Sequence, residues 1–254
     1  MAVGDVHANL TNPLAKRGAM FDGVDDYVEV PHNANQLGTN LTNGFTISAW
    51  IYMKSSGEGS VGRVIDKSTA TNASDGFYLR SGTNQVKFRL NAGTEAQTAG
   101  DITFGGWHHI TVTVTAAGLC NIYKNGTITG SANQNLGQAT STITTTNAPR
   151  IGNLTGATTT TLDGTIGKVK MWNKVLTTAE RALDYAGREV KGTIIDVPLQ
   201  KNYDGVTNSG SRLVAIDDQV ATAVKTARAL GGATDHHMIA FNESKVFTVE
   251  VEET

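Results

Sequence analysis

Residues 107–126 decide the fold of this chain: Trp-His-His-Ile-Thr-Val-Thr-Val at 107–114 and, after a short break, Leu-Cys-Asn-Ile-Tyr-Lys-Asn-Gly at 119–126. Ile110, Val112 and Val114 alternate with threonines, and this period of two places one set of side chains on the core face of a β-strand. Asn125-Gly126 favours the two positive φ angles of a type I′ turn. The stretch therefore predicts two strands and a hairpin that returns through residues 127–129.

The composition fits strands joined by many turns, because 28 of the 254 residues are glycine and only 17% are charged. This length corresponds to one large β domain, or to one domain of usual size with a smaller one. The net charge is −2 and no basic run occurs, which argues against nucleic acid as a partner. Cys120 is the only cysteine, and its place in a predicted strand indicates a buried structural thiol.

The first residues, Met-Ala-Val-Gly-Asp at 1–5, have neither the basic start nor the apolar run of a signal peptide. No later segment is apolar enough to span a bilayer. We therefore expect synthesis in a cytoplasm without a signal peptide and no insertion into a membrane. This expectation leaves open where an assembled particle that contains the chain would act.

Alternating apolar residues predict further strands at 27–31, 45–52, 63–67, 76–80, 85–90, 150–152 and 162–172. In the last of these, the period of two places Ile166 and Lys168 on one face and Val169 and Met171 on the other. A G-x-G-x-x-G spacing occurs at 57–62, but residues 63–67 predict a strand where a dinucleotide site needs a helix. We interpret that spacing as a glycine-rich turn.

A helix is predicted to begin after Thr177, because Thr177 and Glu180 have the spacing of a capping box. The pattern changes near residue 190. It then predicts a strand at 193–199, a helix that begins at Asp217 or Asp218, and a closing hairpin over 238–251. The sequence thus predicts an N-terminal arm (1–18), a β domain (19–190) and a small α+β tail (191–254). A tail of roughly 60 residues is near the lower limit for folding alone, so we expect it to dock on the first domain or on a partner.

Six short motifs occur in one order over residues 19–190, and this ordered set resembles the laminin-G-like, concanavalin-A-like jelly-roll domains. The motifs are Phe-Asp-Gly at 21–23 with Asp-Tyr-Val-Glu-Val-Pro at 26–31, Phe-Thr-Ile-Ser-Ala-Trp-Ile at 45–51, Trp-His-His-Ile at 107–110, Tyr-Lys-Asn-Gly at 123–126, Arg-Ile-Gly-Asn at 150–153, and the segment 162–180. The resemblance implies an all-β, two-sheet antiparallel jelly-roll sandwich, here with a small α+β C-terminal extension. Members of that superfamily are mostly binding modules, often for glycans, and many carry a structural calcium ion.

The sequence departs from the calcium ligands that the resemblance implies. The acidic segment that the family has near its start is not visible in residues 1–18, and Gly167 stands where the family has an aspartate. Asp22 and Asp163 are the candidate ligands that we select, with Asp25 and Asp26 as further acids in the same turns, because a hard cation needs several oxygen ligands. Acids in turns also cap the backbone as Asx turns, so this alternative stays open. Apart from calcium, no cofactor is expected.

Nothing in the sequence predicts catalysis. The resemblance implies β-glucan hydrolysis only where two carboxylates share a strand as E-x-D-x-E or E-x-D-x-x-E, and this triplet is absent, as is a G-x-S-x-G elbow. The adjacent histidines at 108–109 and at 236–237 point to opposite faces of a strand and cannot chelate as a pair. We therefore predict a protein without enzymatic activity.

Two functions remain from the sequence. The first is a structural or interaction protein in a larger assembly, because the tail lies outside the family resemblance and no secretion signal is seen. We take this as the leading hypothesis, in the form of a bacteriophage virion-surface protein, such as a capsid decoration or accessory protein, with capsid protein as partner and homo-oligomeric assembly. The alternative is a lectin-like, carbohydrate-binding module, with or without calcium, that acts in adhesion to cell-surface glycans. The candidate residues for stacking on sugar rings are Trp50, Tyr52 and Tyr78, together with Trp107.

Overall fold

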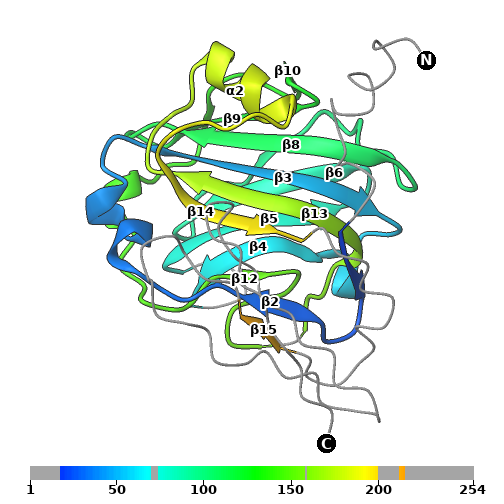
Figure 1. The fold of residues 1–254 in the computed structure, drawn as a ribbon. Helices are drawn as coiled ribbons and strands as arrows, with labels where there is room; N and C mark the ends of the chain where they lie inside the picture. Colours follow the sequence, from blue (N-terminus) through cyan, green and yellow to red (C-terminus); the bar gives the residue numbers. More distant parts are fainter. Residues whose placement is uncertain (1–17, 70–73, 158, 200–211, 215–254) are drawn as a thin grey trace, which may run out of the picture.

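The computed structural model describes residues 18–69, 74–157, 159–199 and 212–214. These residues form two β-sheets that pack face to face (Figure 1). Within these described ranges, all strand pairs are antiparallel except one, between β15 and β2. The all-β, two-sheet antiparallel sandwich that the sequence predicts is therefore confirmed.

The first sheet has eight strands and the second has seven among the described residues. The eight-stranded sheet has the order β1 (Ala19–Asp22), β13 (Asp163–Trp172), β3 (Phe45–Met53), β8 (Trp107–Val114), β9 (Leu119–Lys124) and β10 (Thr127–Ile128), with β14 (Thr193–Pro198) on β13 and β11 (Gln134–Asn135) on β9. The seven-stranded sheet has the order β15 (Arg212–Val214), β2 (Tyr27–Glu29), β12 (Arg150–Ile151), β4 (Arg63–Ser68), β5 (Gly76–Gly82), β6 (Gln85–Leu90) and β7 (Ala96–Gln97). Short 3-10 helices lie at η1 (Ala34–Gln36), η2 (Gly38–Asn40), η3 (Glu58–Ser60) and η4 (Thr140–Thr142).

The stretch at 107–126 forms β8, β9 and the start of a hairpin, as predicted. β8 pairs with β3 along its whole length, from Trp107 opposite Tyr52 to Val114 opposite Phe45. Residues 125 and 126 have φ angles of 51° and 83° and turn the chain into β10. Cys120 on β9 is fully buried, and burial raises the pKa of its thiol, which fits a structural role.

One predicted pair of faces is wrong, and a β-bulge is the reason. In the β13–β3 register, Ile166 lies opposite Ile51 and Val169 lies opposite Ala49, with a shift between them. The extra residue reverses the alternation, so Ile166, Val169 and Met171 all belong to the core. Lys168, which the sequence placed beside Ile166, instead pairs with Asp196 of β14 at 3.1 Å.

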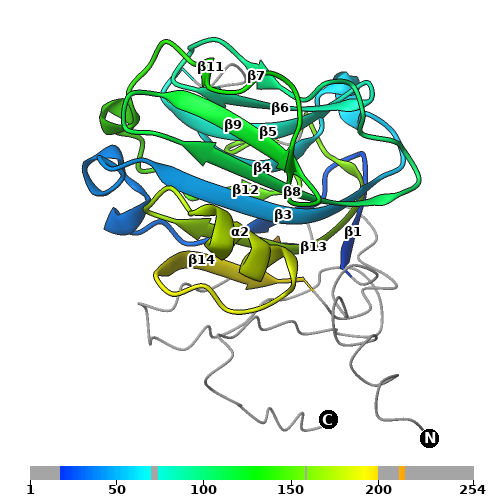
Figure 2. The ribbon, with the colours of Figure 1, turned by 90° about the horizontal axis from the view of Figure 1, so that it is seen from above.

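The predicted helix is α2 (Thr178–Tyr185), and its capping box is present. The backbone N–H of Glu180 donates to Thr177 Oγ1, and the N–H of Thr177 donates to Glu180 Oε2 at 2.9 Å. The helix lies outside the eight-stranded sheet (Figure 2). Among the described residues, no helix has the length and the apolar character needed to cross a membrane.

The sandwich continues past the predicted boundary at residue 190. β14, which the sequence assigned to the tail, pairs with β13 and places Ile195 and Val197 in the core. These apolar side chains are the physical reason that this strand joins the sheet. The predicted helix near 217 and hairpin at 238–251, like residues 1–17 of the predicted arm, lie outside the described residues.

Candidate functional site

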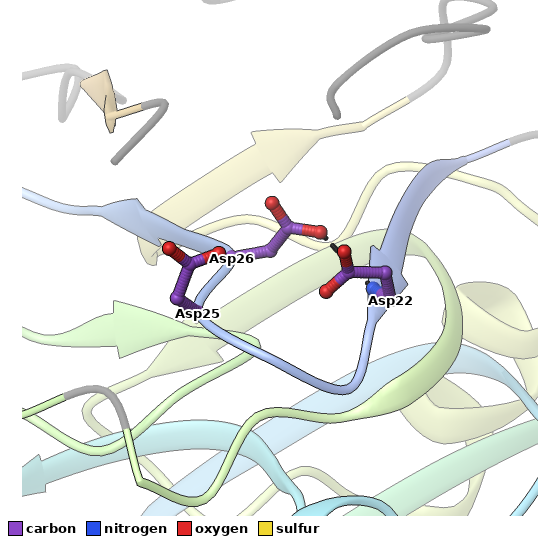
Figure 3. A group of neighbouring side chains, drawn as sticks. All are labelled: Asp22, Asp25 and Asp26. Carbon is purple, nitrogen blue, oxygen red and sulfur yellow. Dashed lines mark hydrogen bonds between the residues drawn. The ribbon is translucent and has the colours of Figure 1, made fainter. Parts of the chain in front are cut away.

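Three aspartates gather where the chain crosses from one sheet to the other (Figure 3). Asp22 ends β1, and Asp25 and Asp26 lead into β2. One carboxylate oxygen from each lies within 4.8 Å of the other two. The backbone N–H of Asp22 donates to Asp26 Oδ2 at 3.0 Å, and the N–H of Val24 donates to Asp22 Oδ1 at 2.9 Å. The turn therefore brings three like charges together.

Asp26 is the buried member of this acidic cluster, with 3% of its surface exposed. Its Oδ1 accepts no hydrogen bond among the described residues. Burial raises the pKa of Asp26 to about 6, and the charges of Asp22 and Asp25 add to the rise. Asp26 is a buried carboxylate with one oxygen that accepts no hydrogen bond, and its near neighbours are also acidic. Its negative charge is therefore not balanced by a positive charge beside it. Oxygen donors of this kind are what Ca²⁺ takes in proteins, so the acidic cluster fits a calcium ion.

Of the two metal ligands predicted from the sequence, the structure brings one into the acidic cluster and leaves the other outside it. Asp22 belongs to the acidic cluster. Asp163 lies opposite Asp22 in the β1–β13 register, but its carboxylate is not one of the three that gather. Asp25 and Asp26 take part instead, and the D-x-x-D-D spacing at 22–26 is the sequence signal that points to them.

Trp50, a predicted sugar-binding residue, is covered by α2. Only 7% of its surface is exposed, and its ring stacks on Tyr185 of the helix with centroids 5.7 Å apart. The Trp50 ring also packs against the His109 ring, with centroids 5.0 Å apart. A sugar ring has no access to Trp50 in this arrangement.

Buried charges fasten α2 to the sheet beside Trp50. Asp184 of the helix contacts His109 Nε2 at 3.2 Å and Lys170 Nζ at 3.1 Å. Burial by itself would raise the pKa of Asp184, but the hydrogen bond and charge of His109 and the charge of Lys170 lower it to about 2. A small pocket remains here, lined by Ser48, Trp50, His109, Lys168, Lys170, Asp184 and Gly187. Because its charged groups satisfy one another, we assign this pocket to the attachment of the helix.

Tyr52 and Trp107 form an aromatic pair on the same outer face, beyond the part that α2 covers. They lie opposite each other in the β3–β8 register, with ring centroids 5.8 Å apart. Both are half-buried. The register extends this row through Thr165 of β13 to Met20 of β1, whose side chain is 39% exposed. We call Tyr52 and Trp107 the aromatic platform.

Tyr78 lies on the outer face of the opposite sheet, so the structure does not bring it together with Trp50 and Tyr52. It is buried, with its ring under the Arg63 guanidinium at 3.9 Å. Its hydroxyl donates to Glu95 Oε1 at 2.8 Å. The ring of Tyr78 is therefore covered and offers no open surface for a sugar to stack on. Its contacts are with polar neighbours.

Comparison with known protein families shows where this fold belongs. Residues 22–180, more than half of the chain, match the model of the concanavalin A-like lectin/glucanases superfamily. The chain belongs to this superfamily. None of the curated proteins compared with the chain matches it.

Solved structures with this concanavalin A-like fold share little sequence with the chain. A candidate carbohydrate-binding protein from Bacteroides ovatus has a TM-score of 0.51 and 15% identity, over 77% of this chain and 54% of that one. The CBM40 domain of the Ruminococcus gnavus IT-sialidase, bound to α2,3-sialyllactose, has a TM-score of 0.50 and 14% identity, over 66% and 96%. A Trypanosoma rangeli sialidase has a TM-score of 0.50 and 15% identity, over 67% of this chain but only 27% of the enzyme. At such identities these likenesses concern the fold alone.

Proposed function

We propose that this concanavalin A-like domain is a non-catalytic carbohydrate-binding module whose sugar site is the aromatic platform. The observation that carries the proposal is the half-buried pair Tyr52 and Trp107, which lies beside α2 and not beneath it. Aromatic rings present an apolar face with a polar rim, which suits the C–H face and the hydroxyls of a sugar ring. The proteins of similar fold that are described as carbohydrate-binding support this function.

We further propose that the acidic cluster holds calcium, with Asp22, Asp25 and Asp26 as ligands. The ion would supply positive charge and fix the crossover between the sheets. Met20 and Asp22 point to the same face of β1, because they are two residues apart on one strand. Met20 also ends the row that begins at Trp107. The acidic cluster thus lies on the platform's face of the sheet, just beyond the end of this row, and calcium would order that end of the sheet.

The platform is tested by truncating its rings. Tyr52→Ala and Trp107→Ala should each weaken glycan binding at least about fivefold, because stacking on an aromatic ring contributes roughly 1 kcal/mol beyond the area it buries. A glycan array with the intact chain identifies the sugar, and calorimetry then measures the loss. Ile128→Ala is the matched control, since Ile128 is an exposed apolar residue (42%) on β10 at the far side of the same sheet. If Tyr52→Ala and Trp107→Ala bind the glycan as tightly as Ile128→Ala and the unsubstituted chain do, the platform is not the sugar site.

The leading hypothesis from the sequence stays a prediction. It places the chain on a virion surface as a homo-oligomer bound to capsid protein, after synthesis in a cytoplasm. Light scattering of the purified chain gives its oligomeric state, and the glycan array gives its affinity for sugars. Together they separate the two functions. An oligomer without glycan affinity would support the structural role, whereas a stable monomer with micromolar affinity for a glycan would support the lectin-like module.

A further inference from the structure

The outer face of the seven-stranded sheet carries a row of cations on neighbouring strands. Arg63 of β4 lies opposite Arg80 of β5, and Arg80 lies opposite Lys87 of β6. In the next row Arg89 of β6 lies opposite Tyr78. Like charges directly opposite each other on adjacent strands destabilise a sheet. A fold that keeps four cations this close needs anions to neutralise them.

The described residues supply two anions for these four cations. Asp66 pairs with Arg63, with Oδ2 and Nε 2.9 Å apart, and both side chains are buried. Glu95 accepts from Arg80 through two bonds, from Nε at 2.7 Å and from Nη2 at 2.8 Å. Its Oε2 also lies 3.8 Å from Lys87 Nζ. The patch therefore keeps an excess of two positive charges, on its Lys87 and Arg89 side.

The charged side chains of this patch are partly exposed to solvent. The side chains of Arg80, Lys87 and Glu95 are 13%, 24% and 22% exposed. Arg89 is half-buried; its Nη2 donates to the carbonyl of Ala92, and its side chain also lies against the Tyr78 hydroxyl. The patch thus presents partly exposed positive charge beside a carboxylate whose position is already fixed.

We infer that this patch, formed by Arg80, Lys87, Arg89 and Glu95, binds the carboxylate of an acidic sugar. Lys87 and Arg89 provide the charge for the sugar carboxylate, and guanidinium groups suit carboxylates through paired N–H donors. Glu95, held by Arg80 and by the Tyr78 hydroxyl, would accept from the sugar hydroxyls. The same carboxylate disfavours a phosphate, which carries more negative charge than a sugar carboxylate at neutral pH. Tyr78, which the sequence nominated for stacking, is here a positioning residue for Glu95.

This site is separate from the aromatic platform, so the two proposals can fail independently. The probes are N-acetylneuraminic acid and galacturonic acid, each with its methyl ester, and sodium acetate, measured by calorimetry or NMR titration on the intact chain. We expect at least one sugar acid to bind, with its methyl ester and acetate at least tenfold weaker. Rising salt should weaken binding, because the contacts are partly exposed charges.

Variants locate the binding. Lys87→Gln and Arg89→Gln should each lower the affinity for the sugar acid about tenfold. Lys54→Gln, which changes an exposed lysine near the other sheet, should leave that affinity unchanged. Tyr52→Ala should also leave this binding unchanged. The inference is overturned if the ester binds as well as the acid, if acetate binds as tightly as the sugar, or if the Lys87 and Arg89 variants bind normally. Loss of binding in Tyr52→Ala alone would assign the acidic sugar to the platform.

Discussion

Asp26→Asn tests the acidic cluster most directly, because the substitution removes one charge and keeps the side-chain shape. In the ion-free protein the pKa of Asp26 is raised from 3.8 to about 6. The folded state therefore binds more protons than the unfolded state between these values, and stability falls as the pH rises through this window. A shift of about two pKa units corresponds to about 3 kcal/mol of destabilisation at pH 7.

We expect Asp26→Asn to raise the free energy of unfolding by about 2–3 kcal/mol at pH 7 in the presence of a chelator. The asparagine can still accept from the Asp22 N–H. For a domain of this size the change corresponds to a rise of about 5–10 °C in the unfolding temperature. At pH 4 the gain should vanish, because Asp26 is then protonated in the folded wild-type protein.

Calcium should remove this difference. At a concentration 100 times its Kd, an ion that binds only the folded state stabilises it by about 2.7 kcal/mol, and the wild-type protein should gain this. Asp26→Asn should gain much less, because it lacks a charged ligand. The assay is thermal unfolding at pH 4–7.5 with chelator or with millimolar calcium. Asp163→Asn is the matched control, and its calcium response should equal that of the wild type. An unchanged calcium response in Asp26→Asn, or its destabilisation at pH 7 without calcium, would refute the reasoning.

Two further predictions concern stability. Gly152 has a φ of +89°, and a Cβ there would lie 2.0 Å from the ring of Phe21, so Gly152→Ala should cost about 3 kcal/mol or more in urea unfolding. Gly156→Ala shares the positive φ but meets nothing within 4 Å, so it should cost only about 1 kcal/mol; equal losses would contradict the clash. The lowered pKa of Asp184, about 2, should contribute about 2 kcal/mol that is present above pH 4 and lost as the pH falls to 2. Asp184→Asn should therefore flatten this acid limb in a pH series of unfolding curves, and an unchanged limb would contradict the assignment.

Local patterns in the sequence determined the elements of this protein. The alternation in residues 107–114 specifies a strand because side chains of a strand point to opposite faces. Asn125-Gly126 specifies the turn because both residues tolerate positive φ, and Thr177 with Glu180 specifies the start of α2 through bonds three residues apart. Each signal lies within a few residues, so it can be read without knowing what packs against it.

The tertiary structure alone decided which side chains reach solvent and which meet each other. Trp50 alternates out of the core as Tyr52 does, yet α2 covers Trp50 and leaves Tyr52 half-buried. The cations Arg63, Arg80 and Lys87 come from three strands and form one row only through their registers. The acidic cluster likewise depends on the crossover between the sheets. Because such contacts are set by register, bulges and the docking of a helix, the period of a single strand cannot specify them.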